Sequence, residues 1–297
     1  MGRGASVVTG ACVTRDTPVC YLCGGEASRA LCEYRQLDRY EQSLGLSEGG
    51  YLRRWLACTS CGFHYSFSNR RDTLDALYAT SYRDESVQRV SLRQRFDSVV
   101  SLPYERSENK QRVRALRAML AEAGRILPAG GDGRRRVLDI GGGIGVFLYE
   151  FLDQDWEGYV VEPLAATCEF IRETMPGVGV VNGYFAPSLF TVRFHLVTLI
   201  QTLEHIEDPL RFLTGVRGEL DRDGFVFIES PDSLNFRVLS PDHDVFGSPH
   251  RFMFDPASLA ALVTRAGLSP LVVRRDRAVR GHVNVSCLAV RDDAGIR

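Results

Sequence analysis

Apolar runs with strand character alternate with amphipathic stretches through the second half of the chain. The runs are short and rich in β-branched and aromatic residues, which is the pattern of buried strands. They lie at residues 137–140, 158–161, 194–201 and 225–229. Apolar positions recur at helical spacing in the stretches between and after them, at residues 146–152, 210–220 and 257–266. We therefore predict a succession of strands and helices, with a turn at residues 222–224.

The first half of the chain is organised differently. Residues 1–17 are predicted to be a flexible tail, and residues 18–70 contain most of the cysteines. Residues 71–130 are predicted to be a helical linker, since apolar residues recur at helical spacing between positions 109 and 123 and a helix start is predicted near Asp72. The strand-and-helix domain is then predicted over residues 131–297.

Two neighbouring predicted strands end in acids, and the first runs directly into glycine. Asp139 is followed after one residue by a glycine turn, residues 141–145, and Glu162 ends the next strand. Glycine lets backbone N–H groups approach a ligand closely because no Cβ is in the way. A carboxylate at the tip of the neighbouring strand suits a bidentate contact with a ribose diol. The chain is therefore predicted to bind a nucleoside-bearing cofactor.

Two cofactor classes use this arrangement, and the glycine spacing distinguishes them. The dinucleotide fingerprint requires G-x-G-x-x-G, but Val146 and Phe147 stand where the third glycine would be sought. S-adenosylmethionine has no pyrophosphate to cradle. The spacing therefore favours S-adenosylmethionine, with an ordinary βα turn as the alternative.

Several motifs resemble those of the class I S-adenosylmethionine-dependent methyltransferases. The run VLDIGGGIG at residues 137–145 resembles the first motif of that family, and LIQTLEHIEDP at residues 199–209 is similar to the fourth motif of one branch. The same branch has a histidine, an aromatic pair and then a helix, as found here from His250 onwards. The resemblance covers about residues 135–290. It implies a Rossmann-like α/β core with a seven-stranded, mostly parallel sheet.

The resemblance also implies which residues hold the cofactor. Asp139 stands at the strand end in that family, and the glycine turn wraps the methionine part. Glu162 is expected to bind the ribose, and Gln201, at the end of the fourth strand, to face the methionine end. The glycines concerned are Gly141, Gly143 and Gly145.

Two positions depart from the family pattern. His195 stands where an aspartate often precedes the fourth strand, and the acid usually sought near the third strand for the adenine is missing. Asn182 or the main chain is therefore expected to contact the adenine amino group.

Two histidines are candidates for catalysis. Methyl transfer from a sulfonium is an in-line displacement, so the protein mainly holds nucleophile and methyl carbon in line. A base helps when the acceptor is a hydroxyl or a carbon acid, and histidine suits this role. His205 and His250 both follow strands, at the edge of the sheet where ligands bind in this fold. The structural alternatives are a packed turn containing Glu204 and His205, and a loop ordered by His250.

The helical linker is expected to lie over the cofactor cleft as a lid. Its polar side chains would then reach an anionic substrate, with exposed polar surface as the alternative. The side chains concerned are Arg93, Arg95, Tyr104 and Arg106.

Six of the eight cysteines lie in the first 61 residues, and four of them form two C-x-x-C pairs, each followed by glycine. Such knuckles place four thiolates around one zinc ion, which leaves no open position for catalysis. In a cytoplasmic protein metal is favoured over disulfides, with reduced core cysteines as the alternative. We predict structural zinc at these pairs, with Cys32 and His64 as spare donors. The predicted ligands are Cys20, Cys23, Cys58 and Cys61.

Charge and hydropathy limit the partners. The formal net charge of −1 gives no overall attraction to nucleic acid or to an anionic membrane. No apolar run approaches the roughly 20 residues that span a bilayer, and the N-terminus lacks a secretory core. The sequence predicts a cytoplasmic protein that acts on a small molecule, without membrane or nucleic-acid partners.

Three functions fit these observations. The first is methylation of an oxygen or carbon of a sugar nucleotide or secondary metabolite, because methyltransferases of such pathways carry similar zinc modules. The second is RNA methylation, which the 34 residues between Cys23 and Cys58 and the near-neutral charge disfavour. The third is a non-catalytic zinc-bearing scaffold, which the intact Asp139, glycine turn and Glu162 disfavour.

Overall fold

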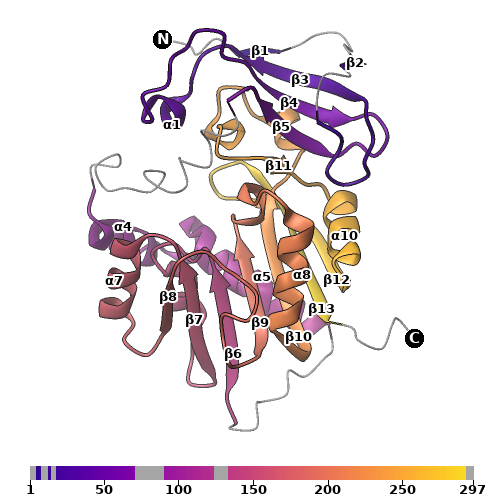
Figure 1. The fold of residues 1–297 in the computed structure, drawn as a ribbon. Helices are drawn as coiled ribbons and strands as arrows, with labels where there is room; N and C mark the ends of the chain where they lie inside the picture. Colours follow the sequence, from indigo (N-terminus) through magenta and orange to yellow (C-terminus); the bar gives the residue numbers. More distant parts are fainter. Residues whose placement is uncertain (1–4, 8–12, 15–17, 71–89, 124–132, 292–297) are drawn as a thin grey trace.

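The computed structural model describes residues 5–7, 13–14, 18–70, 90–123 and 133–291 (Figure 1). A seven-stranded sheet forms the larger part, and a smaller amino-terminal sheet lies at one end of it (Figure 1). The two parts share one apolar core, because Leu56 and Tyr65 of the small sheet belong to the same buried cluster as Leu138 and Ile228 of the large sheet.

The large sheet has the strand order β12-β13-β10-β9-β6-β7-β8. β13 runs antiparallel to both its neighbours, and the central strands are parallel to one another. The predicted seven-stranded, mostly parallel sheet is therefore confirmed. Its strands are β6 (Arg135–Ile140), β7 (Trp156–Glu162), β8 (Gly179–Asn182), β9 (Phe194–Ile200), β10 (Leu220–Pro231), β12 (Leu268–Arg277) and β13 (Val283–Arg291).

Helices cover both faces of the large sheet. Alternate residues of a strand point to opposite faces, so in β10 Phe225 and Phe227 join one apolar cluster while Val226 and Ile228 join the other. The first cluster contains side chains of α5 (Glu108–Glu122), α6 (Val146–Phe151) and α7 (Ala165–Thr174). The second contains side chains of α8 (Pro209–Glu219) and α10 (Pro256–Arg265).

The helices α8 and α10 both begin at an Asp-Pro pair. The Asp208 carboxylate accepts a hydrogen bond from the Arg211 N–H, and the Asp255 carboxylate accepts one from the Ser258 N–H. Each carboxylate satisfies an N–H group that the first helical turn leaves unpaired. The proline that follows sits at the first helical position, where a missing N–H costs nothing. Both helices begin within a residue or two of the starts predicted for them, at residues 210 and 257.

The amino-terminal sheet contains strands from both ends of the chain. Its order is β1-β3-β4-β5-β11, with β2 also paired to β3. β11 follows β10 in the chain, so residues 18–70 do not close the sheet by themselves. The strands are β1 (Ala5–Val7), β2 (Val13–Thr14), β3 (Ser28–Tyr34), β4 (Arg53–Cys58), β5 (His64–Ser68) and β11 (Phe252–Met253), and the short helix α1 (Arg39–Gln42) connects β3 to β4.

Two parts of the sequence prediction need correction here. The predicted tail at residues 1–17 contains β1 and β2, because the outer edge of β3 offers them unpaired backbone groups. The predicted turn at 222–224 lies inside β10, whose register with β9 shifts between Leu220 and Phe225.

The linker is helical where it is described. It contains α4 (Leu92–Val100), η1 (Tyr104–Arg106) and α5, which covers the predicted stripe at 109–123. The helix predicted near Asp72 lies outside the described residues. Among the described helices, none has the length and apolar character that crossing a membrane requires. Three short elements complete the fold near the site, namely η2 (Leu203–His205), α9 (Asn235–Val238) and η3 (Asp244–Phe246).

Candidate active site and cysteine cluster

The loop between β6 and α6 has the conformation that its glycines allow. Gly141, Gly143 and Gly145 have φ angles of 73°, 55° and 75°. Gly145 immediately precedes α6, where a left-handed residue turns the chain into the helix. Asp139, at the end of β6, is buried and its Oδ1 accepts a hydrogen bond from the Thr198 hydroxyl at 2.7 Å. The loop is therefore held from the sheet side, and its other side faces a cavity.

Glu162 connects this glycine loop to the turn that follows β7. Its buried carboxylate accepts a hydrogen bond from the Gly143 N–H at 3.0 Å and another from the Leu164 N–H at 3.1 Å. This one side chain therefore holds both the glycine loop and the turn after β7.

Glu162 also lines a cavity of about 540 Å³, which we call the Glu162 cavity. Gly141 forms one side of it, and Gln201, Thr202 and His205 form another. Apolar and aromatic residues make up the wall beyond Glu162, which suits a purine ring: Pro163, Leu164, Tyr184, Phe185 and Phe212.

Asn182 lies beside this cavity and does not line it. Its amide nitrogen donates to the carbonyl oxygens of Glu162 and Pro163, at 3.2 Å and 2.9 Å. The amide therefore braces the turn after β7, and the cavity wall is formed by the next residues, 183–185. An adenine contact through Asn182 stays a prediction, and the main-chain alternative fits the wall at residues 183–185.

A second cavity, of about 760 Å³, lies on the other side of the glycine loop. We call it the glycine-loop cavity. Asp139 and Gly141 line it, together with residues that the sequence patterns did not single out: Arg39, Tyr40, Asn109 and Arg112. Arg112 is held by Glu229, with Nη2 at 2.6 Å from Oε1. Of the four linker side chains expected to reach a substrate, only Arg95 lines this cavity.

Gln201 has a backbone conformation that is unusual for its residue type. Its φ is 51°, and among the described residues only one other non-glycine residue, Ser188, has a positive φ. The conformation is held by a hydrogen bond from the Gln201 N–H to the Glu229 carbonyl oxygen at 2.8 Å. Strained residues of this kind cluster at functional sites.

A third cavity, of about 390 Å³, is lined by four of the six histidines of the chain. We call it the histidine cavity. Gln201 and His205 line both this cavity and the Glu162 cavity, so the two adjoin. Tyr40, which lies on α1 of the amino-terminal part, lines both this cavity and the glycine-loop cavity. The histidines are His205, His243, His250 and His282.

The two predicted catalytic histidines lie next to each other, with ring centroids 4.9 Å apart. His205 Nδ1 lies 3.0 Å from the Pro249 carbonyl oxygen, and His250 Nδ1 lies 2.6 Å from the Val245 carbonyl oxygen. A carbonyl oxygen only accepts, so each Nδ1 carries a proton. Burial lowers the pKa of His250 and the pKa of His282, which keeps both rings neutral at pH 7.

His195, the departure from the family pattern, has a structural environment. It is buried in β9, and its Nδ1 accepts a hydrogen bond from the Arg136 N–H at 2.9 Å. It lies at the start of β9, whereas the cavities lie at the carboxyl ends of the strands. Burial lowers the pKa of His195, so it supports the sheet as a neutral ring.

The four cysteines of the two C-x-x-C pairs come together. Their sulfurs lie within 4.8 Å of one another, with Cys20 Sγ 3.6 Å from Cys61 Sγ and Cys23 Sγ 3.6 Å from Cys58 Sγ. Burial alone would raise the pKa of the Cys58 thiol, but N–H groups of Cys61 and Ser60 point at its sulfur and lower the pKa to about 7.

The turns that carry these sulfurs need glycine, and the spare donors lie elsewhere. A Cβ on Gly25 would lie 3.1 Å from Cys58 Sγ and 2.9 Å from Ser60 Oγ. Cys32 donates instead to the Tyr34 hydroxyl, and the His64 ring stacks on Phe236, so neither belongs to the cluster. Four close sulfurs fit a tetrahedral thiophilic ion such as zinc.

Comparisons with known proteins agree with this geometry. Residues 106–272 match the methyltransferase domain family, and the chain belongs to that family. No curated protein matches the chain. Its fold is that of the class I S-adenosylmethionine-dependent methyltransferases.

Two solved structures illustrate the likeness in fold. Magnesium protoporphyrin IX methyltransferase from Synechocystis PCC 6803, with bound S-adenosylhomocysteine, is 15% identical; the match covers 75% of this chain and 100% of that one, with a TM-score of 0.52. The 1,6-didemethyltoxoflavin-N1-methyltransferase from Burkholderia thailandensis, with bound 1,6-didemethyltoxoflavin and S-adenosylhomocysteine, is 17% identical; the match covers 79% and 98%, with a TM-score of 0.53.

Proposed function

We propose that the chain transfers a methyl group from S-adenosylmethionine to an oxygen or carbon of a small molecule, a sugar nucleotide or a secondary metabolite. One observation carries the proposal: the Glu162 cavity and the histidine cavity share Gln201 and His205. A methyl donor in the Glu162 cavity and a methyl acceptor in the histidine cavity would therefore lie next to each other beside His205.

The residues of the Glu162 cavity would each take one part of the donor. The Glu162 carboxylate would accept hydrogen bonds from the ribose hydroxyls, and the aromatic wall at residues 184–185 would pack on the adenine. The glycine loop leaves room for the methionine part, with Gln201 beside it. When bound, S-adenosylmethionine supplies a methyl group already activated on a sulfonium.

His205 is the base that this arrangement supports best. It lines both cavities, whereas His250 lines only the histidine cavity. The Pro249 carbonyl holds a proton on His205 Nδ1. In the neutral ring Nε2 would then take the proton from an acceptor hydroxyl or acidic C–H as the methyl bond forms. His250 would orient the acceptor beside it.

The acceptor class follows from the wall of the histidine cavity. Tyr40, His243, Arg280 and His282 add hydroxyl, imidazole and guanidinium groups to the two central histidines. Arg280 is paired with Glu108, and the Asp244 carboxylate also lines the cavity. Such a wall offers many hydrogen bonds without excess charge, which suits a polyhydroxylated acceptor. The two neighbours described above also have small-molecule acceptors in their names.

We also propose that Cys20, Cys23, Cys58 and Cys61 hold a structural zinc ion. The close approach of the sulfurs and the N–H groups directed at Cys58 support this. Four thiolates would fill the coordination sphere, so the ion would stabilise the fold and take no part in methyl transfer. Cysteines that bind a metal ion as thiolates and form no disulfides fit a reducing, cytoplasmic compartment.

Binding and turnover experiments test the proposal in sequence. Titration calorimetry with S-adenosylhomocysteine should show one site, and a panel of nucleotide sugars with S-adenosylmethionine should yield a product heavier by one methyl group. With the acceptor so identified, His205→Gln should lower kcat/KM by about 10²–10⁴-fold, whereas His64→Gln, outside the cavity, should not. Absence of S-adenosylhomocysteine binding would favour the scaffold alternative, and retention on heparin with methylation of RNA would favour the RNA alternative.

A further inference from the structure

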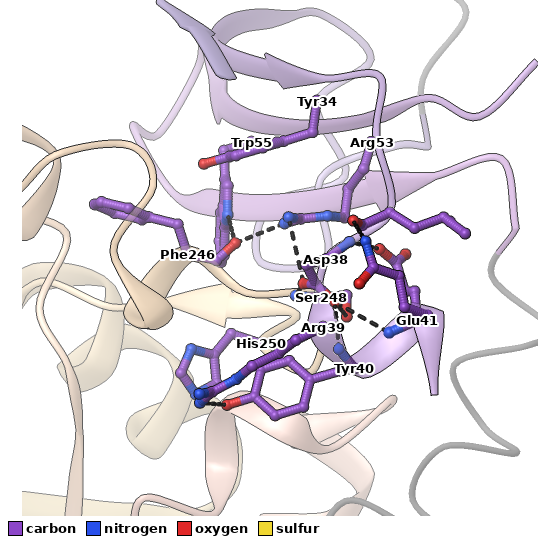
Figure 2. Close-up of polar contacts among 12 residues, drawn as sticks. Tyr34, Asp38, Arg39, Tyr40, Glu41, Arg53, Trp55, Phe246, Ser248 and His250 are labelled. Carbon is purple, nitrogen blue, oxygen red and sulfur yellow. Dashed lines mark hydrogen bonds and ion pairs between the residues drawn. The ribbon is translucent and has the colours of Figure 1, made fainter. Parts of the chain in front are cut away.

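The loop that carries His243 and His250 is held mainly by the amino-terminal part of the chain. The loop follows β10 and contains α9 and η3, and its Phe246 carbonyl oxygen accepts two hydrogen bonds from β4 (Figure 2). Arg53 Nη1 donates at 2.6 Å, and Trp55 Nε1 donates at 3.1 Å. The backbone four residues before His250 is therefore fixed by two side chains of the amino-terminal sheet.

Arg53 is itself buried in a network of polar groups. The Arg53 side chain is 2% exposed. Its Nε donates to the Tyr51 hydroxyl at 3.1 Å, and its guanidinium lies 4.1 Å from the centre of the Tyr34 ring. Asp38 Oδ2 lies 3.7 Å from Nη2 and supplies a negative charge. A buried charge is costly to leave unpaired, so the guanidinium has little freedom to leave this position.

Asp38 connects this network to the loop a second time. Its Oδ2 accepts a hydrogen bond from the Ser248 N–H at 2.6 Å, and its Oδ1 accepts one from the Ser248 hydroxyl at 2.9 Å (Figure 2). The same Oδ1 caps α1 by accepting from the N–H groups of Tyr40 and Glu41. One carboxylate thus fixes both the helix that brings Tyr40 to the histidine cavity and the residue two positions before His250.

The connection continues from His250 to the proposed base. His250 Nδ1 contacts the Val245 carbonyl within the same loop, and the next residue, Arg251, donates its N–H to the Glu204 carbonyl oxygen at 2.8 Å. Glu204 precedes His205, whose own Nδ1 contacts Pro249 of the loop. The orientation of both histidine rings therefore depends on where residues 245–250 are held.

We infer that Asp38, Arg53 and Trp55 are positioning residues of the acceptor site: they fix the loop that orients His250 and His205. The inference rests on the proposed function of these histidines. It gives the amino-terminal part a role beyond stability, because the sheet that carries the four-cysteine cluster also sets the geometry of the histidine cavity. The hydrogen bonds of Glu162 described above join the glycine loop to the turn after β7 instead.

The test uses nuclear magnetic resonance of the full-length protein as purified, with ¹⁵N-labelled histidine. The ring nitrogen shifts of His250, assigned by their loss in His250→Gln, report the tautomer directly. In the wild type we expect one tautomer, with the proton on Nδ1. In Trp55→Phe and in Ser248→Ala, each of which removes one donor to the network, we expect loss of the single-tautomer pattern through mixing or exchange broadening. Trp156→Phe, the only other tryptophan of the chain, is the matched control and should leave the His250 signals unchanged.

Calorimetry with S-adenosylhomocysteine separates positioning from general stability. Both test variants should bind it with unchanged affinity. A wild-type tautomer pattern in both variants would overturn the inference, and so would loss of S-adenosylhomocysteine binding together with the His250 pattern, since the network would then support the whole fold. If the wild type itself does not bind S-adenosylhomocysteine, the proposed function fails, while the comparison of His250 signals can still be read.

Discussion

Glu162 shows how one side chain can hold a binding site in shape before the ligand arrives. Its two oxygens already accept hydrogen bonds from the Gly143 and Leu164 N–H groups. These contacts hold the carboxylate at the wall of the Glu162 cavity, so little side-chain entropy remains to be lost when a ribose binds.

Replacement of Glu162 by alanine should therefore weaken cofactor binding selectively. We expect Glu162→Ala to reduce the affinity for S-adenosylmethionine by about 1–3 kcal/mol, because charge-assisted hydrogen bonds are lost. Titration calorimetry measures this directly. Glu157→Ala, on the same strand but paired with Arg136 away from the cavity, should bind normally. Equal affinities for both variants would refute the ribose assignment.

Gly142 offers a prediction that concerns packing and not binding. A Cβ at this position would lie 2.6 Å from Val160 Cγ2 and 2.9 Å from Asp139 Oδ2, below ordinary contact distances. We expect Gly142→Ala to lower the free energy of unfolding by about 1–3 kcal/mol, as overpacking does. Gly177→Ala, whose Cβ would meet no atom within 4 Å, should be neutral or slightly stabilising. Chemical denaturation of the two variants makes the comparison, and similar midpoints would show that the β6–α6 loop can relax.

At this scale the sequence identifies residues whose role is local. Asp139 and Glu162 could be placed because each ends an apolar run, and the carboxyl ends of parallel strands meet at one edge. Tyr40 and Arg112 could not be placed, since they reach the cavities from elements far away in the chain. The positive φ of Gln201 could not be predicted either, because tertiary contacts determine it and the residue type does not.

Among the elements, length decides what the sequence pattern can predict. Four strands of the large sheet, β6, β7, β9 and β10, contain buried apolar runs that the sequence pattern shows, and they were predicted near their observed positions. β1, β2 and β11 have only two or three residues each. Such strands carry no periodicity and form because a distant edge is available for pairing, so they escaped prediction.

The two cysteine turns are elements whose stability should depend on a metal ion. We expect the purified protein to contain one zinc per chain, and Cys58→Ser to lose it and to unfold at a lower temperature, since metal-binding free energy contributes to folding. Cys32→Ala removes a buried cysteine of the same sheet outside the cluster and should retain the ion. Elemental analysis and thermal melts give both readouts. Full zinc content in Cys58→Ser would exclude that thiolate as a ligand.

For the whole molecule, buried neutral histidines predict sensitivity to acid. Burial lowers the pKa of His64 to about 4 and also lowers the pKa values of His195, His250 and His282. The histidines of an unfolded chain become protonated near pH 6.5. In the folded protein the buried histidines are still neutral at this pH. The contribution of these neutral histidines to the free energy of unfolding is therefore fully present above about pH 6.5. It is lost as the pH falls toward about 4.

Thermal melts between about pH 7 and about pH 5 should show this loss. His64 alone can contribute up to about 3 kcal/mol over the full range, given about 1.4 kcal/mol per pKa unit. In His64→Gln, which has no proton to take up there, the melting temperature should fall less steeply with decreasing pH. A wild-type melting temperature that stays constant over this interval would contradict the prediction.

The pairing of β5 with β11 places a constraint on how the chain is made. Phe252 pairs with Tyr65 and Met253 with His64. Five of the seven strands of the large sheet, β6 to β10, must therefore be synthesised after β5 before its partner exists. Contacts of such long sequence separation form slowly, and an unpaired strand edge attracts other chains. On the ribosome, the amino-terminal sheet would therefore emerge first but stay incomplete until β11 appears, and during that wait we expect the nascent chain to depend on chaperones that shield the open edge of β5.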